Sequence, residues 1–198
     1  MSAVSEIVDE LDQPTPPRTG TWEGDWPQTI PEFERLVEAF QDRLVRYAFC
    51  RLGDLGDAED VAQEVFVRAY ADRQRLQRVT RVTAYLYRMA SNLCTDFLRR
   101  RKYQAVPLEE AEVEDIPAHQ PNGSEAAAAA EELRRIEGAL SRLPDRQAEV
   151  VRLRVFDELR LNEIAEALGC PLATVKSRLR YGLEKLRDIV LREWEVSP

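Results

Sequence analysis

Apolar residues recur at intervals of three and four along much of the chain, which is the spacing of a buried helical face. In the N-terminal half this pattern predicts three helices. The first spans about residues 31–52 and stops at Gly53, the second begins at Asp57, whose side chain would cap the first turn, and the third spans about residues 81–102. The residues expected to face their common core are Phe33, Leu36, Val37, Phe40, Leu44, Tyr47 and Ala48 in the first helix, Ala58, Val61, Val65 and Ala69 in the second, and Leu86, Met89, Ala90, Leu93 and Phe97 in the third.

The C-terminal half shows the same helical spacing. The alanine run at residues 126–130 is predicted to open a helix that reaches about Arg142, because alanine is the best helix former. Pro144 is predicted to begin the next helix. The inward residues of these two helices are expected to be Leu133, Ile136 and Leu140, then Ala148, Val151 and Val155. The predicted fold class is therefore all-α.

A tight corner at residues 169–171 joins the last two predicted helices, which are residues 161–168 and the segment from Leu172 onward. Glycine tolerates the positive φ of a helix end, and proline can begin a helix but not continue one. Ala165 leaves room for a close crossing, and Val175 can fill the space between the helices. This is the make-up of a helix-turn-helix, whose second helix lies in the major groove of DNA.

The second helix of this pair has an apolar stripe and an opposite polar face. The stripe holds Leu172, Val175, Leu179, Leu183, Leu186 and Val190, and the polar face holds Thr174, Ser177, Arg178, Tyr181 and Lys185. Five basic residues and one acid lie between Pro171 and Arg187. The alternative is an ordinary amphipathic helix with a solvated basic face. DNA binding is favoured because the turn chemistry and the Thr, Ser and Arg cluster coincide with the basic face.

The second N-terminal helix carries an apolar residue inside an acidic surface. Asp60, Gln63 and Glu64 surround Val67, with Tyr70 close by. Such a patch suggests a docking surface, although single exposed apolar residues are common. This helix alone leaves both interpretations open.

The third helix carries a basic and aromatic stripe at steps of four and three, formed by Arg81, Tyr85, Arg88, Asn92, Thr95 and Arg99. Residues 73–103 hold nine basic residues and one acid, Asp96. Guanidinium, phenol and amide groups in one stripe suit phosphate contacts and the stacking of unpaired bases. A solvated arginine-rich face is the alternative.

The net charge of −8 is unevenly distributed. Residues 1–32 hold one Arg against seven acids, and residues 104–132 hold eight acids and no Lys or Arg, so the two segments with helical spacing are net positive. We expect residues 1–30 to be mostly disordered, with Trp22 and Trp26 either docked or exposed, and residues 104–130 to be a flexible acidic linker.

Three cysteines and one histidine are widely spaced, so the sequence offers no metal site, and the odd cysteine count suits a reducing compartment. Each cysteine is expected to be a small buried apolar residue. No apolar run approaches membrane-spanning length, and we expect a cytoplasmic protein without a cofactor.

Taken together, these motifs resemble the extracytoplasmic-function (ECF) group of RNA polymerase sigma factors, within the sigma-70 family. GDAEDVAQEVFVRAY (residues 56–70) resembles the family's motif for docking on the polymerase clamp helices. AYLYRMASNLCTDFLRRRK (84–102) resembles the segment that engages and opens the −10 promoter element. The stretch from LPDRQAEVV to LEKLR (143–187) resembles the −35-binding domain.

The resemblance implies a role for each segment. Residues 1–30 would be an extension, 31–103 the region 2 domain, 104–130 a linker and 131–192 the region 4 domain. The implied polymerase-docking residues are Asp60, Gln63, Glu64 and Val67. The resemblance carries Asn92, Asp96, Arg99 and Arg100 onto the −10 motif, and the basic and aromatic stripe adds Arg81, Tyr85 and Arg88 as candidate −10 residues. The implied −35 residues are Thr174, Lys176, Ser177, Arg178, Arg180 and Tyr181.

The resemblance also implies partners and two departures. The partners would be core RNA polymerase, through its β′ clamp helices and β flap, promoter DNA and a cognate anti-sigma factor. Tyr85 stands where the family usually has Trp, and Ala62 replaces a bulkier apolar residue. The acidic linker would either thread toward the active centre as a mimic of nucleic acid or remain solvated.

Two other functions remain as rivals to a promoter-specificity subunit without catalytic residues. A regulator that acts without polymerase could use the same helix-turn-helix. An enzyme, such as a helical nuclease, is disfavoured because the chain has one histidine and no visible ligand cluster.

Overall fold

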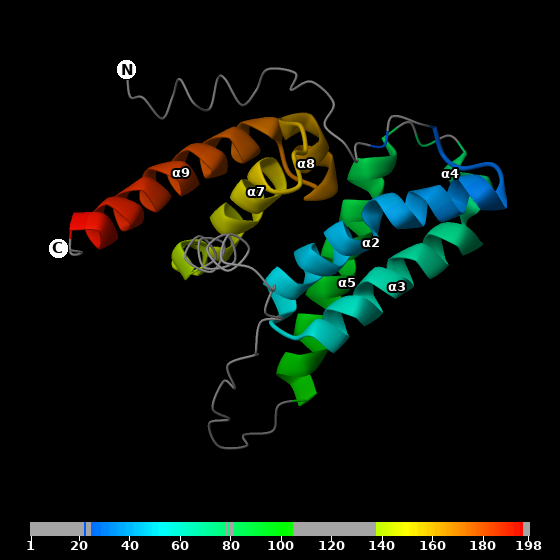
Figure 1. Cartoon of the computed structure of the whole chain (residues 1–198), viewed down its shortest axis with the longest axis horizontal. Helices are drawn as coiled ribbons and strands as arrows, with labels where there is room; N and C mark the ends of the chain where they lie inside the picture. The colour runs from blue at the N-terminus through cyan, green and yellow to red at the C-terminus, as the bar shows by residue number, and fades with distance from the viewer. Residues whose placement is uncertain (1–21, 23–24, 78, 80, 105–137, 196–198) are drawn as a thin grey trace, which may run out of the picture.

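The computed structural model describes residues 22, 25–77, 79, 81–104 and 138–195. Its helices are α2 (Ile30–Leu52), α3 (Leu55–Ala71), the short α4 (Arg73–Leu76), α5 (Val82–Gln104), α7 (Asp145–Val155), α8 (Leu161–Ala167) and α9 (Leu172–Glu195) (Figure 1). The all-α prediction is confirmed. Most of the predicted extension and linker, together with Leu133 and Ile136, lie outside the described residues.

The ends of α2 follow from its sequence. Thr29 and Glu32 form a capping box, in which the Thr29 side chain accepts from the Glu32 amide and the Glu32 carboxylate accepts from the Thr29 amide at 3.1 Å. Hydrogen bonds from the backbone amides of Gln28 and Thr29 to its carboxylate lower the pKa of Glu32. At the other end Gly53 adopts a left-handed φ of 75°, as predicted from its position.

The start of α3 differs from the prediction. Asp54, and not Asp57, caps this helix, because its carboxylate accepts a hydrogen bond from the Asp57 amide at 2.9 Å. Asp57 lies in the first turn, where its charge still complements the helix dipole. The predicted start was therefore two residues too late.

The N-terminal core forms where α2, α3 and α5 pack together. Among the predicted core residues, the buried ones are Leu36, Phe40, Leu44, Tyr47, Ala48, Ala58, Val61, Val65, Ala69, Leu86 and Ala90, and those partly buried against them are Phe33, Met89, Leu93 and Phe97. Trp26 joins this core with 1% of its surface exposed, which settles the open choice for this residue in favour of docking. Cys94 is buried as predicted, whereas Cys50 and Cys170 are only half-buried.

In the C-terminal half α9 packs across α7 and α8. Ala148 and Val151 are buried as expected, but Val155 is 46% exposed, so its assignment to the core was wrong. Val155 is the last residue of α7, and at this end of the helix Leu153 and Arg154 are buried in its place. Gly182 of α9 lies so close to α7 that an added Cβ would meet Val151 Cγ2 at 2.8 Å.

The helix-turn-helix is confirmed. Gly169 has a φ of 60° at the corner between α8 and α9, and the Cys170 amide donates to the Ala165 carbonyl at 3.0 Å. Val175 and Leu179 are fully buried on the inner face of α9, whereas Leu172, the first residue of this helix, is 36% exposed. The N-terminal turns of α9 are therefore anchored from one side.

The two halves of the chain are in contact. Figure 1 shows α7, α8 and α9 beside the group formed by α2, α3 and α5, and the main contact between these groups joins α5 to α8. Polar contacts add to it, since three arginines of α2 reach the α7 end of the C-terminal half.

Candidate functional site

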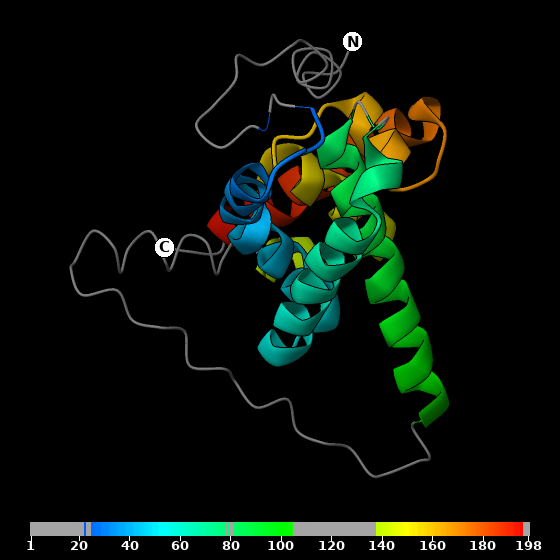
Figure 2. The same ribbon diagram turned by 90° about the vertical axis from the view of Figure 1, so that its right-hand side faces the viewer.

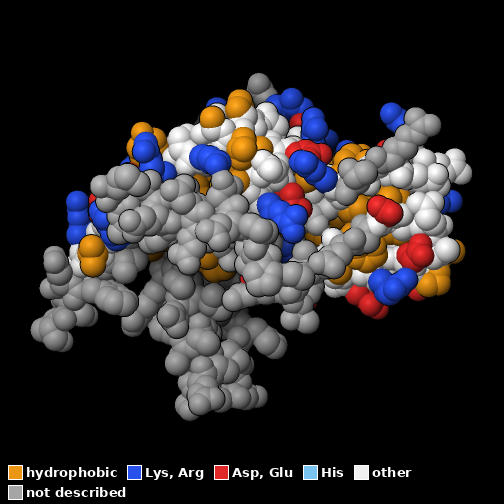
Figure 3. Space-filling model, turned by 90° about the horizontal axis from the view of Figure 1, so that it is seen from above, with side chains coloured by type: hydrophobic (Ala, Val, Ile, Leu, Met, Phe, Trp, Pro, Cys, Tyr) orange, Lys and Arg blue, Asp and Glu red, His pale blue; other side chains and the backbone are white. Residues whose placement is uncertain are grey.

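An apolar groove of about 1070 Å³ lies between α2 and α3. Aromatic and aliphatic side chains dominate its lining, which consists of Phe33, Val37, Gln41, Asp42, Val45, Arg46, Phe49, Leu55, Glu59, Ala62, Gln63, Phe66, Val67 and Tyr70. Hydrophobic side chains are visible among acidic ones at this end of the molecule in Figure 3. A large open apolar surface of this kind marks an interaction site.

The structure places two of the four predicted docking residues in this groove. Gln63 lines it, and Val67 stands there with 56% of its surface exposed. Asp60 is exposed on the same helix but does not line the groove. Glu64 accepts a hydrogen bond from Arg68 Nε at 2.6 Å in an exposed pair one helical turn apart.

Aromatic contacts hold one end of the groove. The Phe33 and Tyr70 rings meet edge to face with centroids 5.1 Å apart, and the Arg73 guanidinium lies 4.3 Å from the Tyr70 ring centroid. Such contacts restrain a half-exposed tyrosine without burying it. The groove is therefore a shaped surface and not a gap between loose side chains.

Four of the six predicted −10 residues face solvent on α5. Arg88, Asn92, Arg99 and Arg100 are exposed, and Arg99 forms a surface ion pair with Asp96 at 3.1 Å. In Figure 2 the C-terminal end of α5 projects away from the other helices. A projecting helix with exposed basic side chains is accessible to the phosphates of a nucleic acid from several sides.

The other two predicted −10 residues are engaged within the protein. Arg81 forms an ion pair with Glu166 of α8 at 3.1 Å. Tyr85 is half-buried, and the Trp26 ring meets it edge to face with centroids 6.0 Å apart. The sequence analysis did not predict that Trp26 packs on Tyr85. The one hint in the sequence was that a large aromatic residue lies three positions before Thr29, the cap of α2.

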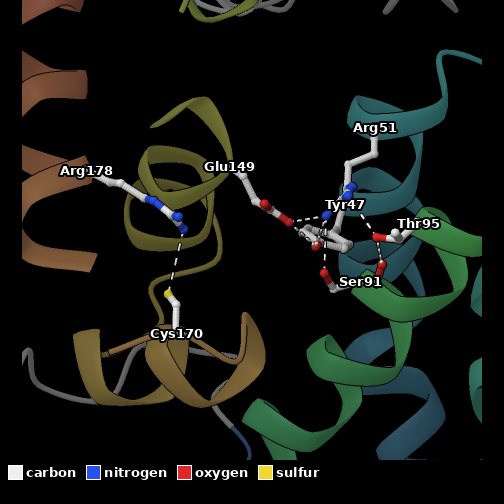
Figure 4. A network of polar contacts seen from close by, with 7 residues as sticks. All are labelled: Tyr47, Arg51, Ser91, Thr95, Glu149, Cys170 and Arg178. Atoms are coloured by element: carbon white, nitrogen blue, oxygen red, sulfur yellow. Dashed lines mark hydrogen bonds and ion pairs between the residues drawn. The ribbon is translucent and has the colours of Figure 1, made fainter. Parts of the chain in front are cut away.

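The predicted −35 residues lie together on the N-terminal half of α9. Arg180 and Tyr181 are exposed, with the guanidinium 4.7 Å from the ring centroid. The Ser177 hydroxyl donates to the Thr174 carbonyl at 3.0 Å, and Lys176 is half-buried. The side chain of Arg178 is held from behind by the corner, since its Nη1 donates to Cys170 Sγ at 3.7 Å (Figure 4).

Two absences hold within the part of the chain that the structure describes. No group of three His, Cys, Asp or Glu side chains there could hold a metal ion. Equally, none of the described helices is long and apolar enough to cross a membrane.

An exposed basic helix-turn-helix, a second basic helix and an apolar docking groove define a DNA-binding protein that works with a protein partner. Residues 36–103 match the family model Sigma-70 region 2, and residues 139–188 match Sigma-70, region 4. The ECF RNA polymerase sigma factor SigW of Bacillus subtilis is 33% identical over 162 residues, which cover 78% of this chain and 87% of that protein. SigE of Mycolicibacterium smegmatis is 31% identical over 191 residues, which cover 95% and 72%.

Solved structures agree on the fold. The sigma factor RpoE of Bartonella quintana, in complex with the anti-sigma factor NepR, has a TM-score of 0.63 at 18% identity and covers 85% of this chain and 100% of its own. CnrH, in complex with the cytosolic domain of CnrY, has a TM-score of 0.60 at 20% identity and covers 96% and 97%.

The chain therefore belongs to the sigma-70 family of RNA polymerase sigma factors, and within it to the ECF group. It binds RNA polymerase and promoter DNA and directs initiation to specific promoters. A regulator that acts without polymerase is not favoured. Sigma factors, the family to which the chain belongs, are not enzymes.

Proposed function

We propose that promoter recognition is divided between the two halves of the chain, residues 31–103 and 131–192. The first half would dock on the β′ clamp helices of core polymerase and engage the −10 element through α5. The second half would read the −35 element as duplex through α9, next to the β flap. The single observation that carries this division is the placement of three solvent-facing surfaces on three separate helices, α3, α5 and α9.

The docking surface would be the α2–α3 groove with the adjoining acidic face of α3. Gln63 and Val67 lie in the groove, while Asp60 and Glu64 extend the surface toward solvent. An apolar centre with a polar rim is the usual anatomy of a protein interface. We assign most of the binding affinity to the apolar groove, and we expect the α3 carboxylates to set the orientation of the partner.

The −10 surface would be the exposed stripe of α5. Unpaired bases expose edges and faces that a duplex hides, and aromatic and guanidinium groups stack on them. Arg88, Asn92 and Arg100 are exposed and can make such contacts, and Arg99 can do so by exchanging its surface ion pair with Asp96. Arg81 and Tyr85 would join them only after Arg81 leaves Glu166 and Tyr85 leaves Trp26.

The −35 surface would be the first two turns of α9. Bidentate contacts to bases contribute roughly 1–3 kcal/mol each, so Arg178 and Arg180 alone do not define a promoter. Two DNA-reading surfaces on one chain gain affinity through effective concentration when polymerase holds them at the right separation. This explains how a protein with a net charge of −8 can select promoters.

Transcription with purified core polymerase tests the proposal. Replacing Asp60 and Glu64 with Lys should reduce pull-down of core, whereas replacing Arg178 and Tyr181 with Ala should leave pull-down intact and reduce run-off transcription from promoters that need a −35 element. Loss of core binding in the Arg178 and Tyr181 variant would show that α9 is wrongly assigned. Sequencing the transcripts made on fragmented genomic DNA would give the promoter consensus.

Three further features belong to the same proposal. The chain would act in the cytoplasm, where the polymerase works, and would have no catalytic chemistry of its own. A cognate anti-sigma factor is proposed as a regulator, supported by RpoE and CnrH, which were each solved with a protein partner. Competition of such a partner with core polymerase for the α2–α3 groove would be measurable in the same pull-down.

A further inference from the structure

The contact between the two halves has a buried carboxylate at its centre. Asp157 follows α7 and has a side chain that is only 3% exposed. Arg46 of α2 donates to its Oδ1 at 2.7 Å, and Arg43 of the same helix donates to its backbone carbonyl at 2.7 Å. Burial raises the pKa of Asp157, and the Arg46 charge opposes that shift. The closed contact therefore depends on Arg46 as the partner of a desolvated charge.

Arg46 also belongs to the docking groove. Its side chain lines the groove together with Asp42, Val45 and Phe49, and it is 48% exposed. Among the described residues, Arg46 lines the groove and also hydrogen-bonds to the C-terminal half, at the Asp157 carboxylate and the Phe156 carbonyl. One side chain thus lies between the surface that meets the polymerase and the contact that joins the two halves.

The closed arrangement is incompatible with simultaneous reading of both promoter elements. Their centres are about 25 base pairs apart by definition, which is about 85 Å of duplex at 3.4 Å per base pair. In the structure α5 touches α8 directly. The 33 residues between Gln104 and Gly138 could reach about 110 Å when extended, so the chain itself permits the separation.

We propose that Arg46 couples occupation of the α2–α3 groove to opening of the contact between the two halves. A helix seated in the groove draws Arg46 toward its own polar groups, which removes the ion-pair partner of the buried Asp157 carboxylate and leaves it only the weaker influence of Tyr87 and Arg43. The closed form then loses stability, and the helix-turn-helix is released. Because binding and opening are linked, a partner that binds the groove also opens the chain, and an opened chain binds that partner more tightly. This inference rests on the proposed docking of the groove.

The experiment measures energy transfer between dyes on exposed positions of α2 and α9, Glu38 and Arg187, in a full-length chain without other cysteines. The probe is a polypeptide that carries only the β′ clamp helices, so that no other polymerase surface can pull the halves apart. Its binding is followed separately by anisotropy. In the wild type, binding should lower the transfer and shift the closed-to-open ratio by about 5–150-fold, the usual range of such couplings.

Variants separate the coupling from a loss of folding. Arg46→Met should open the chain even without the probe. Asp157→Asn removes the charge that needs Arg46, so this variant should stay closed without the probe, and probe binding should shift its closed-to-open ratio at least about fivefold less than in the wild type. The double variant should close again. Circular dichroism checks folding, and Arg46→Lys, which keeps the charge but not the planar fork, should lie between wild type and Arg46→Met.

Two results would overturn the inference. The first is probe binding to the wild type with unchanged transfer, and the second is an Arg46→Met chain as closed as the wild type. Absence of probe binding to every variant would instead refute the docking proposal, and the coupling would fall with it.

Discussion

Glu149 is the residue whose loss should most weaken the contact between the two halves. Its carboxylate in α7 pairs with the Arg51 guanidinium of α2 and accepts from the Tyr47 hydroxyl at 2.7 Å (Figure 4). Arg51 also reaches Ser91 Oγ at 3.2 Å and Thr95 Oγ1 at 3.3 Å of α5. Replacing Glu149 with Ala removes the only member of this network that comes from the C-terminal half.

The size of the effect follows from burial. The side chains of Arg51 and Glu149 are 20% and 15% exposed, so the pair is largely desolvated. Removing one partner of a buried pair costs about 3–5 kcal/mol, and we expect about 2–3 kcal/mol here because Arg51 keeps its hydroxyl partners. Since each 1.4 kcal/mol is a factor of ten, the closed-to-open ratio should fall by roughly 30–150-fold.

Energy transfer between dyes on α2 and α9 measures this ratio in the free protein. Asp188→Ala is the matched control, because it removes one carboxylate from the exposed Arg187–Asp188 ion pair within α9. Since Arg187 must stay intact in this control, its second dye is placed on Arg192. Exchanging the charges in an Arg51→Glu, Glu149→Arg double variant should restore part of the closed form. A Glu149→Ala chain that stays as closed as the control would refute the reasoning.

Three further predictions concern local packing and are checked by chemical denaturation. Gly182→Ala should destabilise the C-terminal half by about 1–2 kcal/mol, because its Cβ would clash with Val151, and Val151→Ala should reverse the loss. Asp54→Ala should cost about 1 kcal/mol as a lost cap, and an equal loss for Asp57→Ala would contradict the assignment. Burial raises the pKa of the Cys94 thiol to about 11 from its ordinary 9.0. The neutral buried thiol therefore contributes its full share to the stability of the fold below pH 9, and this stability is lost as the pH rises toward 11. Between pH 8 and pH 10 the wild type should lose about 1 kcal/mol more stability than Cys94→Ala, and equal pH slopes would contradict this.

Local rules located the helices and the corner of the helix-turn-helix with little error. Gly53 ends its helix as predicted and Gly169 adopts the positive φ predicted for the corner, because few other residues tolerate the left-handed conformation that both have. The error at Asp57 arose because two aspartates three positions apart both suit a helix start, and only the backbone decides which one caps. Val155 was misplaced because helical spacing alone did not show that the last turn of α7 buries Leu153 and Arg154 instead.

Long-range features were beyond reach of periodicity. Arg46 and Asp157 are 111 positions apart and Arg51 and Glu149 are 98 apart, and nothing in either segment indicates that α2 and α7 meet. The same holds for Arg81, which was predicted as a DNA contact on the strength of its stripe and is paired with Glu166. The candidate DNA residues could be proposed from spacing and charge, but which of them are open in the free protein depends on how the halves pack.

Trp26 has a practical consequence for how this protein is cut into fragments. The region 2 family model begins at residue 36, ten positions after this tryptophan. Yet Trp26 is buried against Tyr85 of α5, so a residue outside the region matched by the family model completes the packing of this helix. A fragment trimmed to the family boundary would uncover the first turn of α5. The smallest fragment of this half that keeps the packing of the full chain therefore begins before Trp26.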